Sequence, residues 1–220
     1  MSPVSPTLEL ETRLLDEAPL VFGLDEVGRG ALAGPVTVGA AVIDSSVLRT
    51  AVPEGLRDSK LVTEKRRPAV AERTAAWVRQ TTLGWATPGE VDEVGIIGAL
   101  GLAASRALEA MRSCGFHPAD GISLLDGNHD YLSRIALPSL GRIDVRTIVK
   151  GDRDRAVISA ASIAAKVSRD ALMVDLHDEH EVYAWNRNKG YASAAHRAAI
   201  DVHGLTNHHR RSWAIGPALT

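Results

Sequence analysis

Carboxylates stand at or just beyond the ends of three predicted strands in this sequence. They are the neighbours Asp25 and Glu26, then Asp126, then Asp152. In open α/β sheets ligands bind beyond the strand ends, so side chains at those ends come together. Carboxylates held together repel one another unless a cation neutralises them, and such hard oxygen ligands suit Mg²⁺ or Mn²⁺ rather than zinc. The four acids therefore predict a divalent-metal site.

The adjacency of Asp25 and Glu26 has a chemical use. Neighbouring strand residues point to opposite faces, and where the backbone turns at a strand end the two carboxylates can reach different sides of one or two metal ions. A pair of ions about 3.5–4 Å apart clamps the attacking and leaving oxygens of a phosphodiester. An Asp-Glu pair alone more often marks a solvated turn or a salt bridge. The catalytic hypothesis gains support because Asp126 and Asp152 repeat one pattern, an apolar strand followed by Asp beside Gly.

A glycine-rich segment, GRGALAGP at 28–35, follows the first two acids. Glycines let a ligand approach the backbone closely and expose N–H groups to anions. The spacing of Gly28, Gly30 and Gly34 weakly resembles a dinucleotide-binding fingerprint, but that fingerprint requires a helix after the loop, and a strand is predicted here. We therefore expect no nucleotide cofactor. A simple tight turn is the alternative, although beside a metal site the loop fits contact with a sugar-phosphate backbone better.

The composition is that of a soluble globular protein, with 45% hydrophobic and 24% charged residues among 220. The net charge of −2 does not indicate nucleic-acid binding, but residues 186–211 carry five Lys or Arg against one Asp. Cys114 is the only cysteine, which excludes an internal disulfide and a cysteine-ligated zinc cluster and favours a reducing cytoplasm. The apolar stretch at 31–43 is shorter than the ~20 residues of a membrane span. No membrane association is expected.

The hydrophobic pattern predicts the elements that must position these residues. Strands are predicted at 20–25, 36–43, 81–87, 122–126 and 145–150, and helices at 63–80, 90–114, 157–180 and 193–203. The glycine turn between the first two strands indicates an antiparallel hairpin. Strands that come first and then alternate with helices indicate an α/β or α+β domain with a mixed five-stranded sheet flanked by helices, and a small helical C-terminal region.

The sequence DEVGRG at 25–30, with GPV at 34–36, resembles the opening motif of type 2 ribonuclease H, ribonuclease HII. Further segments agree in order: DSK at 58–60, DGN at 126–128, KGD at 150–152, SAASIAAKVSRD at 159–170, KGY at 189–191, and His196. The resemblance runs from about Phe22 to Trp213. Departures from the usual pattern include Val27, Leu61 with Val62, and Ser193, and none removes a carboxylate.

The resemblance implies a ribonuclease H-like fold and an endonuclease that cleaves RNA in RNA–DNA hybrids. It also implies incision on the 5′ side of single ribonucleotides in duplex DNA, leaving 3′-hydroxyl and 5′-phosphate ends. Under it, the four acids coordinate the catalytic metals. Gly28, Arg29 and Gly30 meet the ribose 2′-hydroxyl, Tyr191 stacks on the neighbouring deoxyribose, and Lys60 contacts a phosphate.

The pattern also divides the chain. Residues 1–19 are expected to be an N-terminal extension, 20–180 the catalytic domain, and 181–220 a helical region that contacts substrate. The resemblance suggests a monomer. His208 and His209 are expected to be exposed and, with Arg210 and Arg211, either to face a phosphate backbone or to stabilise the tail. Cys114 is expected to be a small buried residue.

Two other functions remain open at this point. Another two-metal nuclease would share the carboxylates but lack the ribose-reading loop. A non-catalytic nucleic-acid-binding module would need a basic or aromatic surface but no carboxylate cluster. A dinucleotide-dependent oxidoreductase is disfavoured by the missing helix after the glycine loop.

Overall fold

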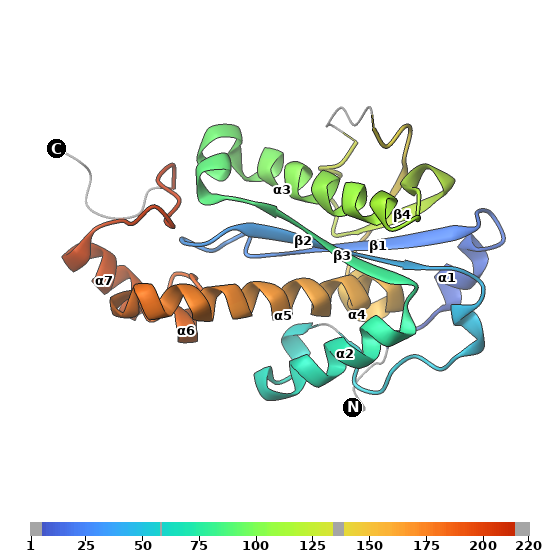
Figure 1. Cartoon of the computed structure of the whole chain (residues 1–220), viewed down its shortest axis with the longest axis horizontal. Helices are drawn as coiled ribbons and strands as arrows, with labels where there is room; N and C mark the ends of the chain where they lie inside the picture. Colours follow the sequence, from blue (N-terminus) through green and yellow to red (C-terminus); the bar gives the residue numbers. More distant parts are fainter. Residues whose placement is uncertain (1–5, 58, 134–138, 214–220) are drawn as a thin grey trace.

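The computed structural model describes residues 6–57, 59–133 and 139–213, arranged as one sheet between layers of helices (Figure 1). The strands are β1 (Leu20–Val27), β2 (Val36–Ile43), β3 (Gln80–Ala86), β4 (Gly121–Asp126) and β5 (Asp144–Ile148). Their order across the sheet is β3-β2-β1-β4-β5. β2 is antiparallel to β1 and β3, whereas β4 is parallel to β1 and β5 to β4. The predicted mixed five-stranded sheet is confirmed.

Helices connect and cover these strands. They are α1 (Glu9–Leu14), α2 (Arg67–Trp77), α3 (Pro88–Ser113), α4 (Gly151–Asp154), α5 (Ala156–Glu179), α6 (Trp185–Asn188) and α7 (Ala194–His203). Short 3-10 turns are η1 (Val47–Arg49), η2 (Ser59–Leu61), η3 (Glu64–Arg66), η4 (Pro118–Asp120) and η5 (Glu181–Tyr183). The helix predicted from residue 63 begins later because Thr63 precedes η3 instead, and Pro68 falls in the first turn of α2, where proline is tolerated.

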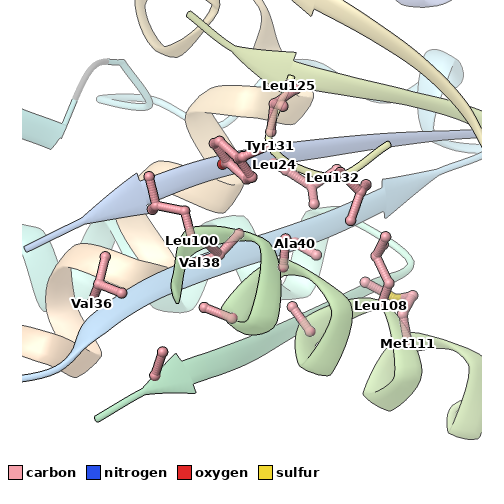
Figure 2. Packing of buried hydrophobic residues seen from close by; sticks show 14 of the residues in the cluster. Leu24, Val36, Val38, Ala40, Leu100, Leu108, Met111, Leu125, Tyr131 and Leu132 are labelled. Carbon is pink, nitrogen blue, oxygen red and sulfur yellow. The ribbon is translucent and has the colours of Figure 1, made fainter. Parts of the chain in front are cut away.

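α3 covers one face of the sheet, and its contact with the strands forms the largest core cluster. Leu24 and Val38 meet Leu100 and Leu108 there, as Figure 2 shows. α3 is long and apolar enough to cross a membrane by length and composition, and half of its most apolar window is buried in the molecule. Its buried side covers the sheet, as expected for the core helix of an α/β fold.

α5 lies against the opposite face at very close range. A Cβ added at Gly39 of β2 would lie 2.3 Å from the backbone oxygen of Ala161 on α5, so only glycine permits this approach. Gly39 is the register partner of Asp25. The small residue therefore lets the start of α5, including Ser162, come up behind the first predicted carboxylate.

The N-terminal segment is packed into this second layer from residue 6 onward. Leu14 of α1 is buried in the cluster that includes Val21 and Val157. The buried Glu11 carboxylate accepts a hydrogen bond from the Val157 N–H at 3.1 Å. The described part of the segment predicted as an extension is therefore joined to the core. Cys114 is exposed, so the prediction that it is buried is wrong, because it caps the C-terminal end of α3 on the outer surface.

The C-terminal helices form a third cluster against the glycine-rich turn. Tyr183, Trp185 and Ile200 pack with Leu32 and Ala33, which lie between β1 and β2. Trp185 is fully buried. This contact joins residues at the two ends of the chain and fixes the turn that follows β1.

Candidate active site

The parallel pairing of β1 and β4 places two predicted carboxylates side by side. Leu24 is the register partner of Leu125. The next residues, Asp25 and Asp126, therefore lie side by side at the ends of neighbouring strands, with their backbones about 5 Å apart. Side chains at matching positions of neighbouring strands share a face. Both acids face α5, because Gly23, two residues before Asp25, has its absent side chain directed at Val157 of that helix.

Glu26 leaves the opposite face of β1. The strand runs to Val27 because Glu26 and Val27 still pair with Val38 and Thr37 of β2. The prediction that the strand ends at Asp25, with a turn between the two acids, is therefore wrong. Arg29 Nη1 lies 3.4 Å from Glu26 Oε1, which ties this carboxylate to the glycine loop.

Asp152 follows β5, as predicted, and lies on the short helix α4. Its N–H donates a hydrogen bond to Asp126 Oδ1 at 3.2 Å. Lys60 Nζ lies 3.3 Å from Asp152 Oδ2. Lys150, just before α4, has a left-handed backbone with φ 61° that turns the chain back from the strand. These contacts link Asp152 to Asp126 on one side and to η2 on the other.

A pocket of about 450 Å³ opens over the end of β1. Among the predicted site residues, those that line it are Asp25, Glu26, Gly28, Arg29, Gly30, Lys60 and Tyr191. Asp126 and Asp152 do not line it, but they adjoin it through the register of β4 and the contact with Lys60. All nine predicted site residues thus fall in one neighbourhood, although they span residues 25 to 191.

Burial raises the pKa of three of the four carboxylates. Burial raises the pKa of Asp25 well above its usual range, and the neighbouring charges of Glu26, Asp126 and Asp152 add to it, while a hydrogen bond from Ser162 opposes it. Burial also raises the pKa of Glu26, although Arg29 lowers it. Burial and the charge of Asp152 raise the pKa of Asp126. A positive ion at this point would relieve both desolvation and repulsion.

The donor set fits a divalent cation by charge and chemistry. Within the described ranges, no group of three or more His, Cys, Asp or Glu side chains is spaced to hold a metal ion. The four acids would hold the cation, with oxygen donors of the kind that Mg²⁺ and Mn²⁺ prefer.

The glycine loop is fastened to Tyr191 from the C-terminal region. The Gly28 N–H donates to the Tyr191 hydroxyl at 3.1 Å, and the N–H groups of Leu32 and Ala33 donate to Gly190 O at 2.8 and 3.2 Å. Gly28 has φ +83°, and a Cβ there would lie 2.1 Å from Arg169 Nε. Glycine is thus required at this position by both backbone and space.

Comparison with known proteins settles the family. The sequence matches the Ribonuclease HII family over residues 22–215. A curated Ribonuclease HII of Streptomyces avermitilis is 46% identical over 217 residues, covering 99% of this chain and 86% of its own length. The chain belongs to the ribonuclease HII family. It is accordingly an endoribonuclease of the ribonuclease H class that acts on RNA–DNA hybrids.

Solved structures agree with this family and with the predicted ribonuclease H-like fold. The ribonuclease HII of Archaeoglobus fulgidus, solved in complex with PCNA, has a TM-score of 0.68 at 25% identity and covers 88% of this chain and 95% of its own. The ribonuclease H2 of Pyrococcus horikoshii OT3 has a TM-score of 0.64 at 24% identity, covering 89% and 94%.

A buried histidine pair supports Tyr191 in this ribonuclease HII. His196 Nδ1 lies 2.9 Å from Tyr191 O, so it carries the proton and donates, which leaves Nε2 as an acceptor. His209 Nε2 lies 3.1 Å from His196 Nε2 and must donate to it, while His209 Nδ1 accepts from the Thr206 N–H at 3.0 Å. His209 is 1% exposed, so its predicted exposure is wrong. The pair requires both rings to be neutral.

Acidification is expected to weaken this pair. Burial, with the charges of neighbouring His196 and His208, lowers the pKa of His209 from its ordinary value to about 4. Between pH 6.5 and 4, His209 therefore binds a proton in the unfolded chain but not in the folded chain, and the stability of the fold decreases as pH falls. Wild type should lose about 1–2 kcal/mol more than His209→Gln between pH 7 and 5, in urea unfolding at each pH. The raised carboxylate pKa values act oppositely but equally in both proteins; parallel pH profiles would contradict the prediction.

Several residues of this ribonuclease HII pocket were not predicted from sequence. Ser162 and Lys166 line it, and Arg169 lies beneath its loop. Their i, i+4, i+7 spacing puts them on one face of α5, which is the signal that identifies them. Arg210, predicted to face a phosphate backbone or to stabilise the tail, is fully buried, and its Nη1 and Nη2 donate to backbone carbonyls of the glycine loop.

Proposed function

We propose that this ribonuclease HII incises on the 5′ side of a ribonucleotide embedded in duplex DNA, as well as within longer hybrids. The observation that supports the proposal is the pocket itself. It joins acids able to hold metal to a glycine loop and a tyrosine on one surface. A general two-metal nuclease needs the acids alone, whereas a loop fastened to Tyr191 supplies a rigid element that can test for a 2′-hydroxyl.

The proposed roles of the chain follow from these contacts. Asp25, Glu26, Asp126 and Asp152 bind the metal. Two divalent ions, Mg²⁺ or Mn²⁺, would supply water activation and stabilisation of the leaving 3′-oxygen, giving 3′-hydroxyl and 5′-phosphate ends. Gly28, Arg29 and Gly30 contact the ribose, and Tyr191 presents its ring to the neighbouring deoxyribose. The 2′-hydroxyl is recognised and does not attack.

Lys60 is proposed to contact a phosphate next to the cut. Its side chain is 76% exposed at the pocket, although it also contacts Asp152. Arg67 steadies its turn by donating from Nε to Ser59 O and Val62 O, each at 3.0 Å. Arg67 is itself paired with Asp170 at 3.2 Å. Lys60→Ala should therefore raise KM more than it lowers kcat.

The experiment that tests this function uses two duplexes of identical sequence, one with a single ribonucleotide and one all DNA. Cleavage in Mg²⁺ and in Mn²⁺ is followed with mapping of the product ends. We expect a single cut 5′ of the ribonucleotide, with a 3′-hydroxyl, and at least about a thousandfold slower cutting of the all-DNA duplex. Equal cutting of both duplexes would indicate a general nuclease, and binding without cutting in either metal would indicate a non-catalytic module.

Three broader expectations belong to the same proposal. The chain works in the cytoplasm, acts as a monomer and needs no membrane. Residues 20–180 form the catalytic domain, and 181–220 contact substrate beside it. Light scattering of the purified chain, with and without duplex, tests the monomer, for which one chain per duplex is expected.

A further inference from the structure

Two arginines are fully buried beneath the glycine loop, one on α5 and one after α7. They are Arg169 and Arg210, both 0% exposed. Within the described ranges neither forms an ion pair with a carboxylate, and their hydrogen bonds all go to backbone carbonyls. Burying an unpaired cation is costly, and such local costs are typical of functional sites. Neither arginine is among the residues that line the pocket.

Arg210 donates hydrogen bonds to several carbonyl groups of the glycine loop. Its Nη1 donates to Arg29 O at 2.9 Å, and its Nη2 donates to Gly28 O at 2.6 Å and Gly34 O at 3.1 Å. The guanidinium also lies over the Trp213 ring, 5.1 Å from its centroid. Burial and the nearby Arg169 charge lower the pKa of Arg210 to about 10, which leaves it protonated at neutral pH. The two ends of the glycine loop, at Gly28 and Gly34, are thus held by one side chain.

Arg169 closes the loop from the other side. Its Nε donates to Pro35 O at 2.8 Å and its Nη2 to Ala33 O at 3.0 Å. Its guanidinium lies 5.5 Å from the centroid of the Tyr191 ring, in a cation–π contact. Arg169 therefore holds the far half of the loop and the tyrosine ring as one unit.

The carbonyl groups that accept hydrogen bonds from Arg210 determine where the N–H group of each following residue points. A trans peptide is planar, so the carbonyl of one residue and the N–H of the following residue point in opposite directions. The described residues contain no cis peptide. Because the carbonyls of Gly28 and Arg29 point at Arg210, the N–H groups of Arg29 and Gly30 point away from it. Neither N–H has an acceptor among the described residues, and both residues line the pocket.

We infer that Arg210 is the positioning residue for ribose recognition: it turns the Arg29 and Gly30 N–H groups into the pocket, where both donate to an oxygen of the ribonucleotide. This inference rests on the proposed function and deepens it. Lysine cannot replace the planar guanidinium of Arg210, because a single ammonium group on a flexible side chain does not hold two successive carbonyl groups in one plane. Consecutive backbone N–H groups held this way form a ready site for an oxygen with negative charge density.

The test compares Arg210→Lys with wild type on the matched duplexes. Affinities for the single-ribonucleotide and all-DNA duplexes are measured in an Asp25→Asn background, which prevents cleavage, and kcat and KM are measured without it. We expect Arg210→Lys to reduce the ratio of the two affinities by about tenfold or more, with little change in affinity for all-DNA duplex. A matched control is Arg106→Lys, because Arg106 pairs with Glu90 on α3, away from the loop. Its ratio should equal that of wild type.

Each outcome decides between the two claims. If wild type binds both duplexes equally, the proposed function and this inference both fail. If wild type discriminates and folded Arg210→Lys discriminates as well, the inference fails and the function stands. Should Arg210→Lys not fold, Trp213→Leu decides instead, because it removes the ring that covers the guanidinium while Arg210 itself stays in place. That variant should show a ratio below that of wild type, and an unchanged ratio would overturn the inference.

Discussion

Asp25→Asn should reduce single-turnover cleavage of the ribonucleotide duplex by about a thousandfold or more, while the protein becomes more stable. The asparagine keeps the shape of the side chain but removes the charge that is proposed to bind metal. Asp25 is 7% exposed and surrounded by other acids, so folding disfavours its ionised form. When folding raises the pKa of a carboxyl group, the free energy of unfolding of the protein decreases as pH rises through that pKa. At neutral pH the wild type therefore carries this cost.

The stability gain should appear only without metal. Removing the charge should raise Tm in EDTA by about 2–4 °C, for about 1 kcal/mol. Added Mn²⁺ should then raise the wild-type Tm and leave that of the variant nearly unchanged, because ligand binding to the folded state stabilises it. Asp175→Asn on the exposed side of α5 is the matched control and should change neither quantity. Unchanged turnover in folded Asp25→Asn would overturn the assignment of this acid to catalysis.

Alanine at Gly28 and at Gly30 should separate loop geometry from substrate contact. Gly28→Ala forces an L-residue to φ +83° and drives its Cβ into Arg169, which three hydrogen bonds hold in place. We expect a stability loss of about 2–4 kcal/mol, a Tm lower by about 5–15 °C, and cleavage reduced about a hundredfold.

Gly30→Ala should behave differently because its added methyl group has open space. A Cβ at Gly30 meets nothing within 4 Å, and its backbone needs no left-handed φ. The Tm should stay within about 1 °C of wild type. The same open space is where the ribose is proposed to lie, so KM for the ribonucleotide duplex should rise about tenfold. Normal KM in Gly30→Ala would show that the sugar does not approach this position.

Much of this arrangement was predictable because it depends on local chemistry. The strands of the sheet follow from apolar runs bounded by glycine, and the four acids follow from their places at strand ends. The motif order then led to the glycine loop and Tyr191. The positions of strand ends were less predictable, because β1 continues to Val27 only through its pairing with β2, a tertiary contact that no local pattern encodes.

The buried cations were not predictable for a related reason. Arg169 and Arg210 donate to backbone carbonyls, and the sequence does not record where carbonyls point. His209 and Arg210 lie in a run of polar residues at 206–212. Polarity alone therefore predicted that both side chains would be exposed. Their burial depends on the glycine loop, which lies some 180 residues earlier in the chain, as the Arg210–Gly28 contact shows.

That separation has a consequence for how the enzyme comes into being. Contacts between distant parts of a chain form late in folding, because closing a long loop costs conformational entropy before the contact can stabilise the fold. The contacts that Gly28 makes with Tyr191 and Arg210 span 163 and 182 residues of the chain. The docking of the C-terminal region onto the glycine loop is therefore expected to be the last step in assembling this site.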